Sequence, residues 1–260
     1  MQPQYSNLRF NDSMRQLIYV FLLLFCTSAL TQAQGVRIFI AGDSTAQTYD
    51  ENKTLMRGWG QMLPQFFTEQ VEVINRAKAG RSTKSFIDEK RWEGILTDLR
   101  KGDWVIVQFA HNDTSSKPER HASPADFKAN LLRFINDTRV RGANILLLTP
   151  IVMRTFNEQG NLVDDRLKNY PGIIRQVAQE ESVPLIDINL QTRDLILALG
   201  NESSKELYYW VKPGEDTSKP DGAKDDTHMR EAGARKVAQM VAQGMWQMKL
   251  TGLYTSIRLK

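Results

Sequence analysis

Short, almost continuously apolar runs recur along this chain and alternate with longer segments of helical periodicity. An apolar run without polar alternation is typical of a strand that is covered on both faces, as in a parallel sheet between helices. The alternation predicts an α/β fold, a three-layer α/β/α sandwich around a five-stranded parallel sheet. We expect the five strands at residues 36–41, 71–75, 104–109, 145–149 and 183–188.

Helical patterns fill the segments between these runs. In residues 125–141 apolar side chains recur every three to four positions, Ser123 and Pro124 supply a start signal, and Gly142 supplies a stop. Residues 212–224, rich in Pro, Gly, Lys and Asp, are expected to form one long loop. The expected helices are at residues 60–69, 92–100, 125–141, 167–181 and 230–249.

The first 33 residues form a segment of a different kind. Arg9 and Arg15 precede an apolar run at residues 17–29, and small side chains follow as far as Ala33. This order is typical of a secretory signal peptide, and the run is shorter than the roughly 20 residues that a membrane span needs. We expect cleavage after Ala33, export to the periplasm or the medium, and one folded domain at residues 34–260. The alternative is a retained membrane anchor.

Composition argues against several other functions. Cys26, the one cysteine, lies in the expected signal segment, so the mature chain would have no disulfide and no thiolate nucleophile. No two histidines have metal-ligand spacing, and the phosphate-loop and dinucleotide motifs are missing, so we expect neither a metal nor another cofactor. The net charge of +4 comes from scattered basic residues, which does not favour a nucleic-acid partner.

A serine follows the first expected strand, in Gly42-Asp43-Ser44-Thr45. The carboxyl ends of parallel strands form the ligand-binding edge of an open sheet, and a sharp turn there can expose a serine hydroxyl as a nucleophile. We expect Gly42 to relieve the backbone strain of that turn. The alternative is an ordinary strand-to-helix turn in which Asp43 or Ser44 is the N-cap.

An Asp-x-x-His sequence, Asp225 to His228, lies just before the last expected helix. A serine nucleophile needs a histidine to take its proton and a carboxylate to hold that histidine. Asp225 can reach the ring across a single turn, whereas Asp226 is expected to face solvent or cap the helix. The other histidines are His111 and His121, of which His121 lies in a polar loop. The alternative reading makes the whole stretch a helix cap.

Two further segments can supply hydrogen-bond donors at the same edge. Ester hydrolysis passes through a tetrahedral oxyanion, which needs donors aimed at it in advance. Asn112, after the third expected strand, can offer its side-chain amide, and the backbone N–H groups of Ser44 and Gly80 can offer two more. The alternatives are a plain turn at Asn112 and Asp113 and a glycine kept at position 80 only for its positive φ.

The chain order of Ser44, Gly80, Asn112 and His228 resembles that of the SGNH (GDSL-like) hydrolases. The resemblance extends from about residue 36 to the final helix, and its details are those of the rhamnogalacturonan acetylesterase branch. It implies a flavodoxin-like fold, a triad of Ser44, Asp225 and His228, an oxyanion hole of Ser44, Gly80 and Asn112, and removal of acetyl groups from pectic polysaccharide. The segments that resemble this branch are Asn75-Arg76-Ala77, residues 80–86 (GRSTKSF), Arg91-Trp92 and residues 108–113 (QFAHND).

One position departs from the family's pattern. The family usually has glycine before the His-Asn-Asp sequence, and this chain has Ala110. If the position requires a positive φ, alanine carries a strain of about 1 kcal/mol or more. Such strain would shift the loop and weaken the donor at Asn112.

Several other residues are candidate substrate contacts: Asp43, Trp59, Arg81, Trp92 and His111, together with the loop at 212–224. Basic side chains near the cleft would suit an acidic, galacturonate-containing polymer. For the two tryptophans the alternative is burial in the core, which is common for this residue.

These observations predict an exported, monomeric serine esterase that removes O-acetyl groups from rhamnogalacturonan and has no membrane partner once the signal is removed. One alternative keeps the enzyme class and changes the substrate, to xylan, another acetylated sugar, a lipid or an aryl ester. The other alternative is a non-catalytic carbohydrate-binding relative, for which Ala110 is the only support.

Overall fold

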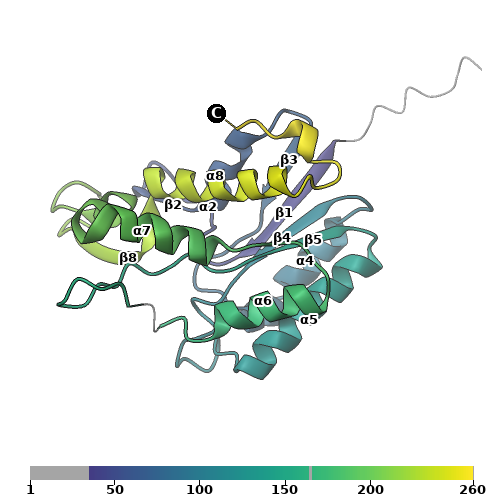
Figure 1. Ribbon diagram of the computed structural model, residues 1–260, viewed down its shortest axis with the longest axis horizontal. Helices are drawn as coiled ribbons and strands as arrows, with labels where there is room; N and C mark the ends of the chain where they lie inside the picture. The colour runs from purple at the N-terminus through teal and green to yellow at the C-terminus, as the bar shows by residue number, and fades with distance from the viewer. Residues whose placement is uncertain (1–34, 164–165, 260) are drawn as a thin grey trace, which may run out of the picture. The chain divides into compact units, whose positions relative to one another are not determined.

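A five-stranded parallel sheet forms the framework of the computed structural model, which describes residues 35–163 and 166–259 (Figure 1). The strand order is β3-β1-β4-β5-β6. The chain adds β3 on one side of β1 and then adds β4, β5 and β6 on the other side, as in flavodoxin-like folds. The predicted fold class is therefore confirmed, whereas the predicted signal segment at residues 1–33 lies outside the described residues. The strands are β1 (Val36–Gly42), β3 (Val71–Asn75), β4 (Trp104–Gln108), β5 (Asn144–Leu148) and β6 (Leu185–Ile186).

Both faces of this sheet are apolar, which explains the uninterrupted apolar runs. In β1, Ile38 and Ile40 belong to one buried cluster, and Phe39 and Ala41 belong to a second cluster on the opposite face. Successive side chains of a strand point to opposite faces, so a strand between two helical layers needs apolar residues at every position.

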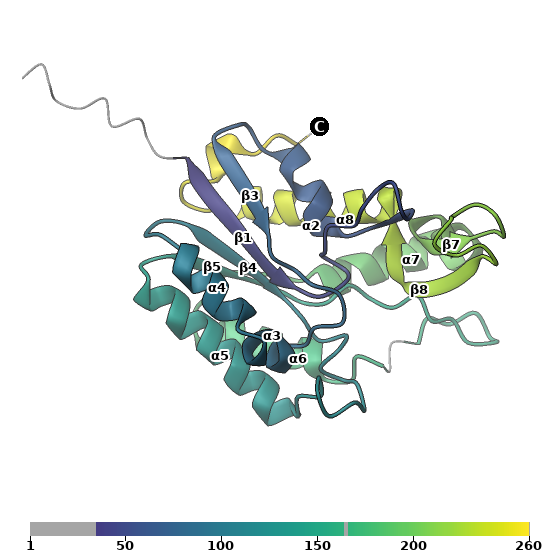
Figure 2. The ribbon, with the colours of Figure 1, turned by 180° about the vertical axis from the view of Figure 1, so that it is seen from behind.

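Helices cover the two faces in separate sets (Figure 2). The first cluster is closed by α2, α7 and α8, and the second by α3 to α6. Pro64 ends α2 early, so the expected helix at 60–69 is a short α-helix followed by the 3-10 turn η1 (Leu63–Phe66). The helices are α2 (Trp59–Met62), α3 (Thr83–Asp88), α4 (Arg91–Asp98), α5 (Pro124–Val140), α6 (Tyr170–Glu180), α7 (Ile188–Ser204) and α8 (Glu231–Gln247).

A second, three-stranded antiparallel sheet was not predicted. It has the order β2-β8-β7 and consists of β2 (Met56–Arg57), β7 (Tyr208–Val211) and β8 (Ala223–Arg230). The expected loop at 212–224 is the connection between β7 and β8, and its last two residues already belong to β8. We call residues 208–230 the β7–β8 hairpin.

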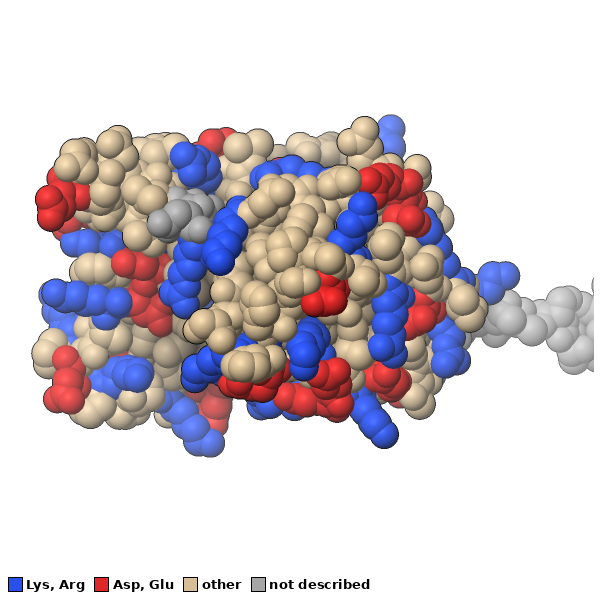
Figure 3. All heavy atoms as spheres, turned by 90° about the horizontal axis from the view of Figure 1, so that it is seen from below, with Lys and Arg blue, Asp and Glu red and all other residues tan. Residues whose placement is uncertain are grey.

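Charged side chains of both signs are interspersed on the face shown in Figure 3. Exposed charges also pair between neighbouring helices, as Lys128 does with Glu180 at 2.8 Å and Arg133 with Glu93 at 2.9 Å. Exposed pairs of this kind each stabilise a fold by at most about 1 kcal/mol. Within the described ranges, no helix is both long and apolar enough to cross a bilayer.

Candidate active site

The carboxyl ends of β1 and β4 meet the β7–β8 hairpin at one edge of the parallel sheet. A hollow of about 630 Å³ opens there, lined by Ser44, His111, Asn112 and His228 among others, and we call it the reaction pocket. Open parallel sheets bind their ligands outside the carboxyl ends of the strands. The edge that the sequence pointed to is therefore the edge at which these side chains gather.

Ser44, His228 and Asp225 form a continuous chain of hydrogen bonds. The Nε2 atom of His228 lies 2.8 Å from the Ser44 Oγ, and its Nδ1 atom lies 2.7 Å from an Asp225 carboxylate oxygen. A carboxylate only accepts, so the neutral ring carries its proton on Nδ1 and presents a bare Nε2 to the serine hydroxyl. This arrangement has the geometry of a nucleophile, a general base and the group that orients the base.

A bulge in β8 brings Asp225 and His228 together. Tyr208 pairs with Met229, yet the next residue of β7, Tyr209, pairs with Asp225, so three residues of β8 have no partner across the ladder. The extra residues turn back, and the second carboxylate oxygen of Asp225 accepts the backbone N–H groups of Thr227 and His228 at 2.8 and 2.9 Å. The Asp-x-x-His sequence thus lies in a bulged strand, and not in the helix-capping turn that was the alternative; α8 has no side-chain cap.

Asp226 neither faces solvent freely nor caps the last helix, and both expectations for it were wrong. Its carboxylate accepts from Arg154 Nε at 2.7 Å and from Trp210 Nε1 at 2.8 Å. The backbone N–H of Arg154 also donates to the Asp226 carbonyl, at 2.8 Å. Arg154 is only 3% exposed and is held by Asn201 as well. These contacts tie the bulge to the loop after β5.

The pKa values of the dyad shift in opposite directions. Burial opposes ionisation of Asp225, but the hydrogen bond and charge of His228 and two backbone N–H groups outweigh it and lower the pKa to about 2. Burial also opposes protonation of His228, but the Asp225 carboxylate outweighs it and raises the pKa of the ring above its ordinary value. The pair therefore stabilises the imidazolium that forms when His228 takes a proton.

The turn that presents Ser44 differs from the expected one in two respects. Gly42 does not have a positive φ; instead a Cβ there would lie 3.1 Å from the Gln108 carbonyl oxygen and 3.2 Å from the Ala46 Cβ, so a larger residue would crowd these neighbours. No described helix begins before Trp59, so neither Asp43 nor Ser44 is an N-cap.

The three expected oxyanion donors have different surroundings. The backbone N–H groups of Ser44 and Gly80 donate to no other protein group within the described residues. Gly80 has a φ of 77°, as the alternative reading required, and lines a neighbouring hollow. Asn112 lines the reaction pocket, where its amide donates to the Arg81 carbonyl at 3.1 Å and retains its second N–H.

Ala110 has a φ of 136° and is fully buried. This is the conformation that glycine adopts readily and alanine does not. The position that lacks the family's glycine is therefore strained, two residues before Asn112.

Asp43 lies in the core and holds the turn that carries Ser44. The prediction that it contacts substrate was therefore wrong. It is completely buried, where its carboxylate accepts from the backbone N–H and the hydroxyl of Thr45 and lies 3.2 Å from His111 Nδ1. Burial opposes its ionisation, yet His111 and Thr45 hold its pKa below the usual range. His111 lines the reaction pocket, but its Nε2 already contacts the Ile151 carbonyl at 3.1 Å.

Three other residues that were expected to contact substrate lie outside the reaction pocket. Trp59 and Trp92 are at most 1% exposed, and their indole N–H groups donate to Gln108 and Asp137, so the core alternative is correct for both. The Arg81 side chain pairs with Glu89 outside the reaction pocket.

Lys219 and Lys224, from the expected loop at 212–224, line the reaction pocket. Sequence reasoning missed two residues at this edge. Arg166 lines the reaction pocket, and no motif marked it. Asp113 is fully buried, where burial raises its pKa to about 7. One of its carboxylate oxygens accepts from Thr83, and the other has no hydrogen-bond partner within the described residues. The buried QFAHND segment could have indicated this carboxyl, which the sequence interpretation took as part of a turn.

Among the described residues, no group of three or more His, Cys, Asp or Glu side chains could hold a metal ion.

Known proteins are similar to this chain over most of its length. Residues 40–236 match the GDSL-like Lipase/Acylhydrolase family. Rhamnogalacturonan acetylesterase RhgT of Bacillus subtilis (strain 168) is 38% identical over 215 residues, which cover 83% of this chain and 91% of that protein. Probable rhamnogalacturonan acetylesterase YesY of the same strain is also 38% identical over 215 residues, covering 82% of this chain and 94% of that one.

Solved structures share the fold. YXIM of Bacillus subtilis superposes with a TM-score of 0.71 at 28% identity, covering 84% of this chain but only 58% of its own. Axe2, an acetylxylan esterase from Geobacillus stearothermophilus, has a TM-score of 0.60 at 18% identity, covering 82% of this chain and 95% of its own. At that identity the likeness to Axe2 extends to the fold alone.

Proposed function

This chain belongs to the GDSL-like lipase/acylhydrolase family, and we propose that it is an exported acetylesterase that removes O-acetyl groups from rhamnogalacturonan. The enzyme class, a carbohydrate acetylesterase, follows from the family and from relatives that carry this name over most of their length. The observation that carries the proposed mechanism is the hydrogen-bond chain from Ser44 through His228 to Asp225.

The first half of the reaction transfers the acetyl group to the serine. Ser44 Oγ attacks the acetyl carbonyl carbon while His228 Nε2 takes the hydroxyl proton, and Asp225 stabilises the imidazolium. The carbonyl oxygen becomes an oxyanion, and the free N–H groups of Ser44 and Gly80 and the Asn112 amide are the proposed donors to it. His228 then protonates the sugar oxygen, which leaves as a hydroxyl.

The second half returns the enzyme to its starting state. His228 takes a proton from a water molecule, the water oxygen attacks the acetyl-serine carbonyl, and a second oxyanion forms at the same donors. Its collapse releases acetate, and His228 returns the proton to Ser44 Oγ. One water is consumed and one acetate is formed for each acetyl group removed.

Two observations support an acidic polysaccharide as substrate. The relatives RhgT and YesY are both named for rhamnogalacturonan. Arg166, Lys219 and Lys224 line the reaction pocket, and within the described residues no carboxylate lies within ion-pair distance of any of them. The two lining carboxylates, Asp225 and Asp226, are already bound by His228 and Arg154, so these basic side chains can attract a substrate of opposite charge.

Acetate release from acetylated rhamnogalacturonan tests this proposal, with acetylated xylan and p-nitrophenyl esters of rising acyl length in parallel. We expect rapid release from rhamnogalacturonan and near-complete loss in Ser44→Ala. Preference for xylan would overturn the polymer, and preference for long acyl chains would indicate a lipid esterase. Equal release by wild type and Ser44→Ala would overturn the mechanism, and binding without turnover by wild type would favour the non-catalytic relative.

Export is supported by the order of basic, apolar and small residues at 1–33. Amino-terminal sequencing of the protein recovered from periplasm and medium tests it. A mature chain that starts at Gln34 is expected, and an uncleaved chain recovered with the membrane fraction would contradict it.

A further inference from the structure

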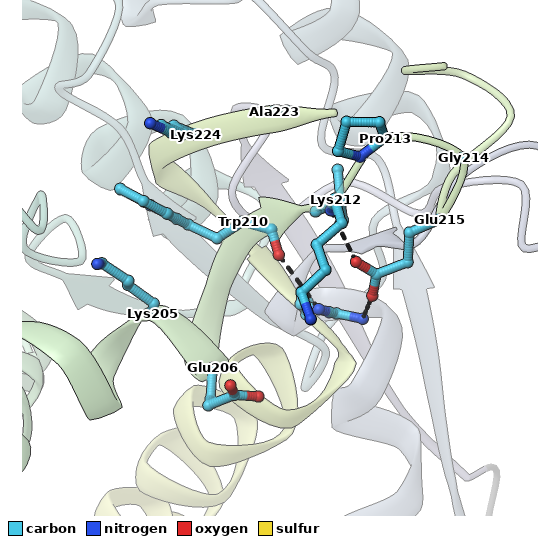
Figure 4. Close-up of a pocket in the computed structure, with 11 residues that line it drawn as sticks. Lys205, Glu206, Trp210, Lys212, Pro213, Gly214, Glu215, Ala223 and Lys224 are labelled. Carbon is cyan, nitrogen blue, oxygen red and sulfur yellow. Dashed lines mark hydrogen bonds and ion pairs between the residues drawn. The ribbon is translucent and has the colours of Figure 1, made fainter. Parts of the chain in front are cut away.

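A second hollow lies beside the reaction pocket on the β7–β8 hairpin (Figure 4). It has a volume of about 870 Å³ and is lined by Lys205, Trp210, Lys212, Lys224 and Arg230 among others. We call it the hairpin groove. None of the proposed catalytic side chains lines it, so the esterase mechanism leaves it without a role.

The two hollows meet at the start of β8, where Ala223 and Lys224 line both of them. Tyr209 and its partner Asp225 line the reaction pocket, and Trp210, the partner of Lys224, lines the hairpin groove. Lys224 lines both hollows, so a chain bound at Ser44 can continue past it into the groove.

Trp210 gathers basic side chains around its ring. The Nζ atoms of Lys205 and Lys224 lie 4.6 and 5.8 Å from the ring centroid, and Figure 4 shows the ring between these two side chains. Attraction of an ammonium to an aromatic ring holds it in place without neutralising it. The indole N–H is used by Asp226, which fixes the ring against the catalytic bulge.

The charges of the groove are only partly compensated. Arg230 pairs with Glu215, and Lys205 pairs with the highly exposed Glu202. Lys212 and Lys224 have no carboxylate within ion-pair distance in the described part of the chain, and Glu206 is the one lining carboxylate without a basic partner there. The reaction pocket adds Arg166 and Lys219, and Lys224 is common to both hollows.

We propose that the hairpin groove is a binding subsite for a uronate sugar of the polymer, remote from the acetyl group being removed. The proposal rests on the proposed function in taking the polymer to be acidic. The sugar carboxylate binds the ammonium group of Lys212, Lys205 adds positive charge beside the Trp210 ring, and apolar atoms of the sugar pack on the exposed part of that ring. A subsite at a distance from the chemistry strengthens the binding of polymer and contributes nothing to a small ester.

A binding measurement that needs no turnover tests the subsite. Oligogalacturonides without acetyl groups are titrated into Ser44→Ala by calorimetry, with neutral xylo-oligosaccharides as the comparison. We expect binding of the acidic oligomer only, weakened by salt. Adding Lys205→Gln and Lys212→Gln is expected to weaken it by about 5- to 20-fold, given at most about 1 kcal/mol for each exposed pair.

The matched control is Lys101→Gln, which removes an exposed charge next to Gly102, at the opposite end of the strands, and is expected to leave binding unchanged. In the protein with Ser44 intact, the paired glutamine variants should lower kcat/KM for acetylated polymer about fivefold more than kcat/KM for p-nitrophenyl acetate. Unaltered binding in those variants would overturn the subsite, as would equal losses on both substrates.

The subsite and the proposed function fail in different ways. If wild type releases no acetate from rhamnogalacturonan but Lys212→Gln still weakens oligogalacturonide binding, the subsite stands and the proposed substrate falls. If acetate is released but oligogalacturonide does not bind, the subsite falls and the esterase stands.

Discussion

The proposed nucleophile and its base are held by two regions of different construction. Ser44 follows β1, an inner strand of the parallel sheet, and the residues around it, Asp43 and Thr45, are almost completely buried. Asp225 and His228 lie on the bulge of a small antiparallel sheet, where their side chains are 29% and 26% exposed. Buried hydrogen bonds inside the core fix the serine, whereas partly exposed hydrogen bonds and one ion pair fix the base.

Because of this difference, substitutions in the two regions should affect the stability of the fold and the catalytic rate to different extents. Changes at Asp43 or Thr45 leave buried polar groups without hydrogen-bond partners, so they are expected to lower the free energy of unfolding. Changes in the bulge disturb polar contacts at the edge of the molecule. The hairpin is therefore the region in which catalysis should be lost while the fold persists.

Replacing the base is expected to have the largest effect. In His228→Ala no group remains to take the Ser44 proton, so kcat should fall by about 10⁴- to 10⁶-fold. Because the ring lies on the bulge, the urea midpoint should change little. A loss of activity that follows the loss of folded protein would contradict the separation between the two regions.

Replacing the orienting carboxylate is expected to come next. In Asp225→Asn the amide can donate to His228 Nδ1, which leaves the proton on Nε2 facing Ser44, and kcat should fall by up to about 10⁴-fold. The wild-type kcat/KM should fall as the pH drops and His228 becomes protonated, with a midpoint above its ordinary pKa because Asp225 raises that pKa. The variant's residual activity should have its midpoint at lower pH. An unchanged midpoint would show that Asp225 does not govern the ring.

Weakening the contact between Asp226 and Arg154 behind the bulge is expected to have a smaller effect, on the rate more than on stability. Asp226→Asn weakens the contact with Arg154 and frees the bulge, and a displacement of about 1 Å costs up to about 100-fold in rate. On p-nitrophenyl acetate, which does not reach the hairpin groove, we expect kcat to fall by about 10- to 100-fold with little change in KM, since Asp226 holds the base. The matched control is Asp221→Asn, an exposed position on the same hairpin. A lower melting temperature with an unchanged kcat would reduce Asp226 to a structural role.

The smallest effect is expected on the sheet side, at Ala110. Glycine accepts the φ of 136° that strains alanine, so Ala110→Gly should raise the free energy of unfolding by about 1 kcal/mol. Urea denaturation measures this. Ala143→Gly, a buried alanine without a positive φ, should instead lose about 0.5–1 kcal/mol. Equal losses at both positions would show that Ala110 carries no strain.

The sequence was informative where one local pattern determines the structure. The apolar runs predicted the parallel strands because both faces of that sheet are buried, and chain order placed Ser44, Asn112 and His228 at one edge. β8 was missed because its sequence, AKDDTHMR, has no apolar periodicity and becomes a strand only by pairing with β7 and β2. Asp226 was misread for a related reason, since its partner Arg154 lies 72 residues away.

Phosphonylation of the serine tests the central claim most directly. The purified protein is treated with a small fluorophosphonate, and intact mass and peptide mapping follow the modification over time. We predict one modification, on the peptide that contains Ser44, that is absent in Ser44→Ala and at least about 1,000-fold slower in His228→Ala. Modification at another residue, or of Ser44 at the same rate without His228, would contradict the account of a core-held serine activated by a base on the hairpin bulge.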